Sequence, residues 1–206
     1  KILMDYYDIW EPVLIVQGDI AFNIDLYDLW EAHRSSGAIM TIVLKELEPG
    51  EDIRRFGVAV LDRDMMIRGF IEKPRSPEQA PSRLINTGIY VVGPWIREFF
   101  EDERGRRMRE SRQTDFGSHV IPEIISRGER GYIMSGYWFD IGTPESYMKA
   151  SFYLLRNLGK EELRATRVYG NVRMMGRSSL SRALHERIIG MIEKKLIRVE
   201  GDILLG

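Results

Sequence analysis

Short apolar runs alternate with an amphipathic segment at the start of the chain. Residues 13–16 and 40–44 are continuous apolar runs rich in Val, Ile and Leu, which predicts strands of an α/β sheet that are buried on both faces. Between them, residues 25–33 have helical spacing of apolar side chains, with Asp25 as the cap and Gly37 at the end. The order strand–helix–strand predicts a βαβ unit with a right-handed crossover.

The middle of the chain is richer in predicted strands. Two strand-like runs, 57–61 and 66–71, flank a predicted turn at 62–64, and residues 75–83 have the proline content of a surface loop. Residues 101–112 are dense in charges of both signs and are interpreted as a solvated loop. Further strands are predicted at 89–92, 132–134 and 137–139, and helices at 94–100, 116–125 and 145–158.

The sequence pattern changes near residue 160, beyond which helix and strand signals are mixed, and this predicts a domain boundary between 159 and 160. The closing residues 199–206 resemble the first rung of a hexapeptide β-helix. The opening residues begin inside an amphipathic pattern with no capping residue ahead of it, so we expect the chain to be cut at both ends.

Composition excludes several classes of function. The 206 residues include 44% hydrophobic residues, enough for a substantial core, and 30 Lys+Arg balance 31 Asp+Glu, which argues against nucleic acid or a membrane surface as a partner. The absence of cysteine excludes disulfides, thiol catalysis and cysteine–zinc sites. Without a signal peptide or an apolar run of about 18 residues, we expect a soluble, cytoplasmic protein.

Two aspartates stand where predicted strands end. Asp19 follows the first buried run and Gly18, and Asp140 precedes a helix that begins near Pro144. Ligands of open α/β sheets bind beyond the carboxyl ends of parallel strands, and Mg²⁺ takes one or two carboxylates together with phosphate oxygens. Two such acids that converge on one edge of the sheet would hold Mg²⁺; the plainer interpretation of each is a turn or capping aspartate.

Polar residues near the other predicted strand ends suit a phosphorylated sugar. Lys73 lies between Glu72 and Pro74, and we expect the proline to hold it extended, with its ammonium presented to a phosphate. The plainer alternative is a solvated ion pair worth about 0–1 kcal/mol. Asn86 offers a donor and an acceptor to a diol, while Gly57 and Gly88 would admit a ring closely or simply form turns. His33 is interpreted as a satisfied core histidine.

Taken in order, these motifs resemble those of the nucleotide-sugar pyrophosphorylases, the sugar-1-phosphate nucleotidyltransferases, from about Val13 to Ala150. The matching segments are Val16-Gln17-Gly18-Asp19, Phe56-Gly57-Val58, Phe70-Ile71-Glu72-Lys73-Pro74, Asn86-Thr87-Gly88-Ile89-Tyr90 and Tyr137-Trp138-Phe139-Asp140-Ile141-Gly142-Thr143.

The resemblance implies an enzyme that joins a nucleoside triphosphate to a sugar 1-phosphate, with release of pyrophosphate. It implies Asp19, Lys73 and Asp140 as catalytic residues, with Asp19 and Asp140 as ligands of Mg²⁺. The implied substrate-binding residues are Gly18, Gly57, Glu72, Lys73, Asn86, Gly88 and Trp138.

The implied fold is α/β, with a Rossmann-like nucleotidyltransferase sheet that is mixed and mainly parallel, has helices on both faces, and is incomplete at the N-terminus. Residues 1–159 would be a partial nucleotidyltransferase domain. Residues 160–206 would be a linker and the start of a left-handed β-helix, a tail that favours assembly into homo-oligomers.

The chain departs from the family pattern at its start, where the glycine-rich loop that cradles the triphosphate is absent. We therefore expect the chain as given to bind triphosphate poorly. Residues 114–117, Thr-Asp-Phe-Gly before Ile-Pro, resemble mannose-1-phosphate guanylyltransferases and slightly favour GTP with mannose 1-phosphate, although a β-helix tail also fits glucose-1-phosphate thymidylyl-, adenylyl- and uridylyltransferases.

Two alternatives stay open: a non-catalytic regulatory homologue that binds sugar nucleotides or a catalytic partner, and a sugar-binding or glycosyl-transfer domain of another α/β fold. A glycine-rich loop in the sequence upstream of residue 1 would favour the enzyme, and its absence would favour the regulatory homologue. A domain of the second kind would make no pyrophosphate.

Overall fold

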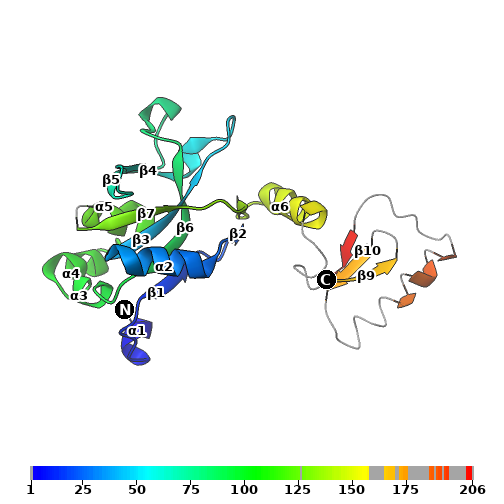
Figure 1. The fold of residues 1–206 in the computed structure, drawn as a ribbon, viewed down its shortest axis with the longest axis horizontal. Helices are drawn as coiled ribbons and strands as arrows, with labels where there is room; N and C mark the ends of the chain where they lie inside the picture. Colours follow the sequence, from blue (N-terminus) through cyan, green and yellow to red (C-terminus); the bar gives the residue numbers. More distant parts are fainter. Residues whose placement is uncertain are drawn as a thin grey trace. The chain divides into compact units, whose positions relative to one another are not determined.

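The computed structural model describes residues 2–125, 127–157, 165–169, 172–175, 186–187, 189–191, 193–194 and 203–205. The chain divides into two compact units, Lys1–Trp138 and Phe139–Gly206 (Figure 1), and each is described by itself. This division concerns compactness only, and the predicted domain boundary between residues 159 and 160 stays a prediction.

The first unit alternates strands and helices up to β7, and its last residue begins β8. Its described elements are α1 (Ile2–Tyr6), β1 (Val13–Val16), β2 (Ile20–Phe22), α2 (Leu26–Ser36), β3 (Met40–Glu46), η1 (Ile53–Arg55), β4 (Gly57–Leu61), β5 (Ile67–Glu72), η2 (Pro77–Gln79), β6 (Leu84–Val92), α3 (Ile96–Phe99), α4 (Glu103–Glu110), η3 (Phe116–Val120), α5 (Ile121–Ile124), β7 (Glu129–Ile133) and β8 (Trp138–Asp140).

The main sheet has the order β5-β4-β6-β3-β7, and β1 also pairs with β6. One edge of β6 pairs with β3, so β1 and β4 share its other edge, each beside one half of the strand. Among the described pairs of this sheet, β3 with β7 is parallel and the others are antiparallel. The mixed α/β sheet is therefore confirmed, but its pairings are mainly antiparallel. The strands β1 and β3 run in the same direction with β6 between them, so they are not neighbours as a simple βαβ unit would have them.

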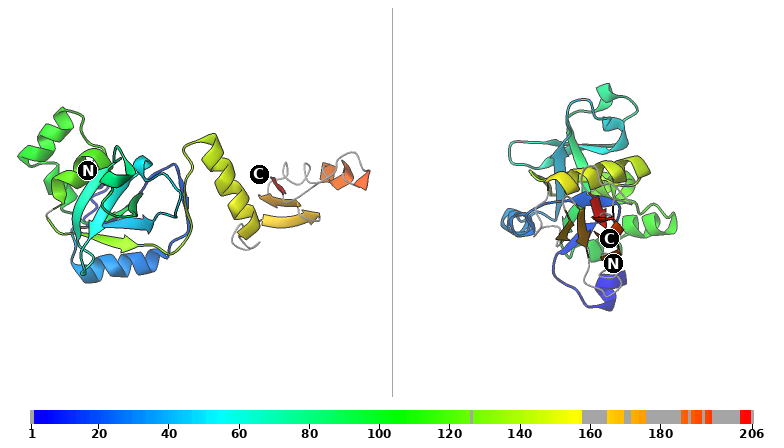
Figure 2. Two further views of the ribbon diagram at one scale, coloured as in Figure 1. Left: turned by 90° about the horizontal axis from the view of Figure 1, so that it is seen from above. Right: turned by 90° about the vertical axis from the view of Figure 1, so that its right-hand side faces the viewer.

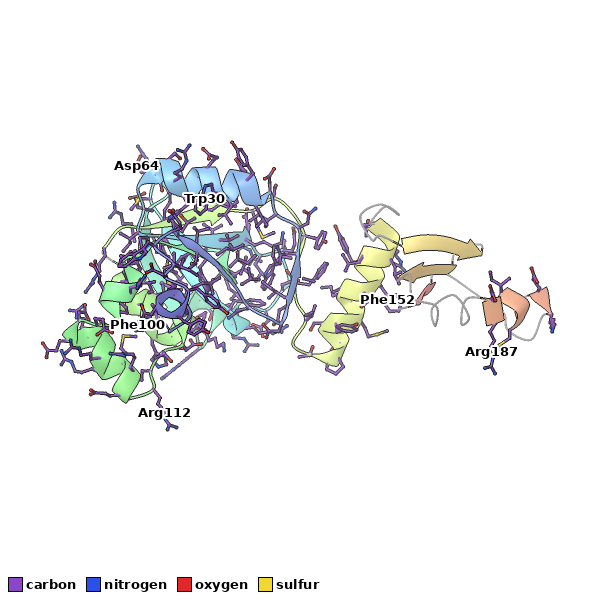
Figure 3. The ribbon with its side chains drawn as sticks, turned by 90° about the horizontal axis from the view of Figure 1, so that it is seen from below. Trp30, Asp64, Phe100, Arg112, Phe152 and Arg187 are labelled. Carbon is purple, nitrogen blue, oxygen red and sulfur yellow. The ribbon has the colours of Figure 1, made fainter. Side chains whose placement is uncertain are left out.

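Helices cover both faces of the sheet, as predicted. The larger apolar cluster joins Met40 and Ile42 of β3 to α3, α4 and α5, and a second cluster joins Val43 to Leu29 of α2. The left view of Figure 2 shows α2 on one side of the strands and α3 to α5 on the other. In Figure 3, Trp30 and Phe100 mark these two layers.

The helix α2 forms where the sequence predicts it. The Asp25 carboxylate accepts hydrogen bonds from the backbone N–H groups of Tyr27 and Asp28, and Gly37 ends the helix at φ 64°. His33 is buried, with its Nδ1 2.9 Å from the Thr41 hydroxyl. The interpretation of His33 as a satisfied core histidine is confirmed.

Two local predictions are wrong. The β1 strand is only half-buried: Val13 and Ile15 pack against the larger apolar cluster, whereas the alternate residues Leu14 and Val16 are 45% and 39% exposed. The charged segment read as a loop contains α4, capped by the Asp102 carboxylate and anchored by the buried Met108. One buried side chain per two turns is too weak an apolar pattern to predict a helix.

The second unit contains the rest of β8, α6 (Pro144–Asn157), β9 (Ala165–Tyr169), β10 (Val172–Met175) and β11 (Ile203–Leu205). The helix α6 begins at the predicted proline, and the Thr143 hydroxyl accepts a hydrogen bond from the Ser146 N–H. The β9 strand pairs antiparallel with β10, and β10 pairs parallel with β11. The start of a β-helix stays a prediction, and Leu158 and Gly159 lie outside the described residues.

Among the helices that the structure describes, none has both the length and the apolar character needed to cross a bilayer.

Candidate functional site

An opening at the edge of β6 brings several predicted residues together. Pairing of β1 with β6 ends at Val16 opposite Ile89, and pairing of β4 with β6 begins at Val58 opposite Ile85. Residues 86–88 therefore lie between the end of one strand and the start of the other. Because both strands are antiparallel to β6, the Gly18-Asp19 turn after β1 and Gly57 at the start of β4 approach this opening from opposite sides.

Gly88 shapes the opening. The pairing of β3 with β6 changes register here, with Ile42 opposite Tyr90 but Leu44 opposite Asn86, and Gly88 has a φ of 77°. A Cβ on Gly88 would collide with the carboxamide of Gln17, whose backbone N–H donates to the Gly88 carbonyl at 3.0 Å. The positive φ favours glycine at this position, and a larger residue would in addition displace the flexible Gln17 side chain.

Asp19 lies two residues beyond Gln17, in an exposed turn. Its carboxylate has no hydrogen-bond or ion-pair partner among the residues that the structure describes. The predicted role of Asp19 needs an accessible carboxylate at the end of β1, and its exposure is compatible with that role.

Asn86 is oriented by the protein itself. Its Nδ2 donates to the Tyr90 hydroxyl at 2.8 Å, and its Oδ1 accepts from the Gly88 N–H at 3.1 Å. The Tyr90 ring stacks on Phe116, with 5.1 Å between the ring centroids. Burial raises the pKa of Tyr90 to about 12, and the nearby carboxylate of Glu72 adds to this rise.

Trp138 forms an aromatic wall beside the opening. Its Nε1 donates to the Thr87 carbonyl at 2.9 Å, and its ring packs edge-on against Phe56 with 5.6 Å between centroids. The Thr87 hydroxyl donates in turn to the Val43 carbonyl, so the backbone under this wall is tied to the core of the sheet.

Glu72 lies between two glycine backbones. It is opposite Gly57 in the β4–β5 pair, and a Cβ on Gly57 would lie 2.5 Å from Glu72 Oε2, while one on Gly117 would lie 2.7 Å from the same oxygen. Its side chain is 22% exposed. Burial raises the pKa of Glu72, the Lys73 ammonium lowers it, and the carboxylate of Asp115 raises it further.

Lys73 does not have the backbone conformation predicted for it. Its φ is 47°, in the left-handed region, although Pro74 was expected to keep it extended. The Lys73 N–H donates to the Phe56 carbonyl at 3.1 Å, and this tie outweighs the local preference of a residue before proline. A left-handed non-glycine residue costs about 1–3 kcal/mol, and such residues cluster at functional sites. The Lys73 side chain is 67% exposed, and its Nζ lies 4.0 Å from Glu72 Oε1.

Asp115 and Gly117 belong to the same cluster, although their positions in the sequence do not predict them as site residues. The Asp115 carboxylate caps η3 by accepting from the Ser118 N–H at 2.7 Å. This bond holds the pKa of Asp115 below its usual value, and the charge of Lys73 lowers it further. The signal in the sequence was an Asp-x-Gly step before a helical run, which local reading assigns to capping alone.

Asp140 belongs to the second unit. There its Oδ1 accepts from the Gly142 N–H at 2.9 Å, just before α6 begins. In the described part of the chain, no cluster of three or more His, Cys, Asp or Glu side chains is placed to hold a metal ion. Shared metal binding by Asp19 and Asp140 stays a prediction.

The geometry of the first unit suits a phosphorylated polyol. Two carboxylates, Glu72 and Asp115, lie near the ammonium of Lys73, and the Glu72 carboxylate lies against the backbones of Gly57 and Gly117. Carboxylates and amides accept and donate hydrogen bonds to hydroxyl groups, an ammonium binds phosphate as a point charge, and an aromatic wall packs against the apolar face of a sugar ring.

The sequence of the chain matches known proteins over most of its length. The family model described as nucleotidyl transferase matches residues 1–157. A glucose-1-phosphate adenylyltransferase from Desulfitobacterium hafniense is 33% identical over 199 residues, which cover 91% of this chain and 48% of the relative. An enzyme of the same name from Pseudothermotoga lettingae is 36% identical over 159 residues, covering 74% of this chain and 36% of the relative.

Among solved structures, one described as a glucose-1-phosphate thymidylyltransferase from Bacillus anthracis superimposes with a TM-score of 0.62. It is 23% identical and covers 76% of this chain and 59% of that one. This likeness supports the fold. The chain spans about half the length of the D. hafniense relative (48%) and 36% of the P. lettingae relative.

Proposed function

The chain belongs to the nucleotidyl transferase family, and on this basis we propose that the protein transfers a nucleotidyl group from a nucleoside triphosphate to a sugar 1-phosphate, giving a nucleotide sugar and pyrophosphate. The observation that carries the proposal is the convergence of Glu72, Lys73 and Asn86 with Gly57 at the opening beside β6. Family membership argues against the alternative of an unrelated sugar-binding or glycosyl-transfer fold.

The proposed reaction needs no covalent nucleophile. A phosphate oxygen of the sugar 1-phosphate attacks the α-phosphorus of the triphosphate, the bond to the bridging oxygen breaks, and pyrophosphate leaves. Catalysis of such a transfer rests on positioning and on neutralisation of charge. In this scheme Lys73 holds the attacking phosphate, while Glu72 and Asp115 accept hydrogen bonds from sugar hydroxyls beside the Trp138 wall.

The family resemblance adds Mg²⁺, held by Asp19 and Asp140. The donor chemistry fits, because Mg²⁺ prefers carboxylate oxygens and fills its remaining positions with water and phosphate. The exposed Asp19 carboxylate, which has no partner among the described residues, supports this role. When bound, the ion would neutralise the charge on the reacting phosphates.

The identity of the sugar and the base belongs to the same proposal. Residues 114–117 favour mannose 1-phosphate and GTP, whereas the relatives at 33% and 36% identity are named glucose-1-phosphate adenylyltransferases. Similarity over most of this chain outweighs one short motif. We therefore propose glucose 1-phosphate with ATP as the first pair to assay, ahead of mannose 1-phosphate with GTP.

The decisive assay measures pyrophosphate release by the protein at its full natural length, across nucleoside triphosphates and sugar 1-phosphates. Asp19→Ala and Asp140→Ala are each expected to lower kcat by about a hundredfold or more, the usual effect of losing one strong electrostatic stabiliser. Lys73→Ala is expected mainly to raise KM for the sugar 1-phosphate. Arg109→Ala removes an exposed cation of α4 and serves as the control.

Unchanged kcat in both aspartate variants at saturating Mg²⁺ would reject the metal ligands. An unchanged KM in Lys73→Ala would make Lys73 an ordinary surface charge. Binding of sugar nucleotide without any pyrophosphate release would favour the alternative of a regulatory homologue.

A further inference from the structure

The side-chain amide of Asn86 is hydrogen-bonded within the protein at both its nitrogen and its oxygen. Its Nδ2 donates to Tyr90 and its Oδ1 accepts from the Gly88 N–H, so the orientation of the group is fixed by β6. Asn86 can therefore offer a ligand only the remaining bonding position at each end, in directions that the protein sets.

A second carboxamide, that of Gln17, makes no side-chain hydrogen bond among the described residues. Gln17 follows the last residue of β1, is exposed, and lays its carboxamide against Gly88, where any Cβ would collide with it. Its backbone N–H is bonded to the Gly88 carbonyl at 3.0 Å, which fixes where the side chain starts. Within the described residues, the carboxamide itself has no hydrogen-bond partner.

We propose that Gln17 is a specificity-determining residue that recognises a sugar hydroxyl at this opening. The inference rests on the proposed function. A carboxamide donates and accepts at once, which matches a hydroxyl group, and an exposed, anchored but unpaired amide can bind a ligand without giving up a bond to the protein. Gly88 then has a second role, because its missing Cβ leaves the space in which this amide lies.

Two hydroxyl-bearing groups could reach Gln17: the ring of the sugar 1-phosphate and the ribose of the nucleotide. Asn86 bonds to Tyr90, and the Glu72 carboxylate raises the Tyr90 pKa, which favours the sugar ring. Asp19, two residues from Gln17, favours the nucleotide. Both present the same chemistry, and the experiment separates them.

The experiment measures binding by calorimetry with the protein at its full natural length, in the presence of Mg²⁺. One arm uses glucose 1-phosphate and its 2-, 3-, 4- and 6-deoxy analogues, and the other uses ATP and its 2′- and 3′-deoxy analogues. The variants are Gln17→Ala and Gln17→Met, the second of which keeps a chain of similar length against Gly88 but cannot bond as an amide. Gln113→Ala, in the loop after α4, removes a glutamine elsewhere as the control.

Both Gln17 variants are expected to weaken binding about threefold to tenfold, the effect of one neutral hydrogen bond. The loss should vanish for one deoxy analogue, which identifies the hydroxyl and assigns it to sugar or ribose. Gln113→Ala should bind like the unmodified chain.

Equal affinity of the Gln17 variants and the unmodified chain for all ligands would overturn the proposal while leaving the proposed function intact. A loss that is the same for every deoxy analogue would overturn it too, since no hydroxyl would then be involved. If the unmodified chain bound neither sugar 1-phosphate nor nucleotide, the proposed function would fail together with this inference.

Discussion

At the scale of single residues, the site depends on glycines, whose lack of a Cβ lets neighbouring side chains lie against the backbone. Gly57 and Gly117 let the Glu72 carboxylate lie against backbone, and Gly88 does the same for Gln17. Of these, Gly88 also has a left-handed backbone that a larger residue would adopt only under strain.

Gly88→Ala should therefore be destabilising, because the new methyl group meets both a positive φ and the Gln17 carboxamide. We expect a loss of about 1–3 kcal/mol in the free energy of unfolding, measured by urea denaturation. Gly18→Ala is the matched control, since a Cβ there has nothing within 4 Å. Equal stability of the two variants would show that Gly88 is not under the constraint described.

The site residues predicted from the sequence are those whose chemistry is visible along the chain, and their roles stay predictions; the residues added from the structure are those that a neighbouring element brings close. Glu72, Lys73 and Asn86 stand at strand ends with chemistry that a ligand needs. Gln17 and Asp115 look ordinary along the chain. The pairing of β1 with β6 brings Gln17 to Gly88, and Asp115, which caps η3, lies near Glu72 and Lys73. Local rules also gave Lys73 the wrong backbone, because a hydrogen bond to Phe56 decides it.

At the scale of elements, strand positions were predictable but their partners were not. The apolar runs of β1 and β3 located both strands, yet nothing in them shows that β6 inserts between the two and pairs antiparallel with each. Two other strands, β4 and β5, lie between β3 and β6 along the chain, so this contact depends on the tertiary fold.

The β7 strand carries a buried acid that should make stability depend on pH. Glu129 is 1% exposed and pairs in register with Met40, and neither of its carboxylate oxygens has a hydrogen-bond partner among the described residues. Burial raises the pKa of Glu129, and the nearby backbone of residues 127–129 and the Arg127 guanidinium offset only part of the rise. The folded state thus favours the protonated form.

The stabilisation from protonated Glu129 is complete below the ordinary glutamate pKa and is lost as pH rises through the raised value. The free energy of unfolding should therefore fall with pH in that window, by at most about 1.4 kcal/mol per pH unit. Glu129→Gln should flatten the fall, whereas Glu110→Gln, on the exposed face of α4, should keep it. Urea denaturation between pH 4 and pH 8 measures both slopes; identical slopes in the two variants would contradict the assignment.

At the scale of the whole molecule, family and fold class were predictable because the motifs keep their order over most of the chain. The nucleotidyl transferase match over residues 1–157 and the TM-score of 0.62 agree with that prediction. The proportion of parallel strands was not predictable, because it is set by pairings between distant segments. The predicted roles of Asp19 and Asp140 concern both compact units and await the kinetic test.

A nuclear magnetic resonance titration of the chain with glucose 1-phosphate in the presence of Mg²⁺ tests whether the opening beside β6 is the sugar-phosphate site. The expected result is saturable shifts of the backbone amide signals of Gly57, Gly88, Gly117 and Lys73, and their loss in the Glu72→Ala/Lys73→Ala double variant. Shifts that gather on other elements, or a spectrum that stays unchanged at saturating ligand, would contradict the site proposed for this protein.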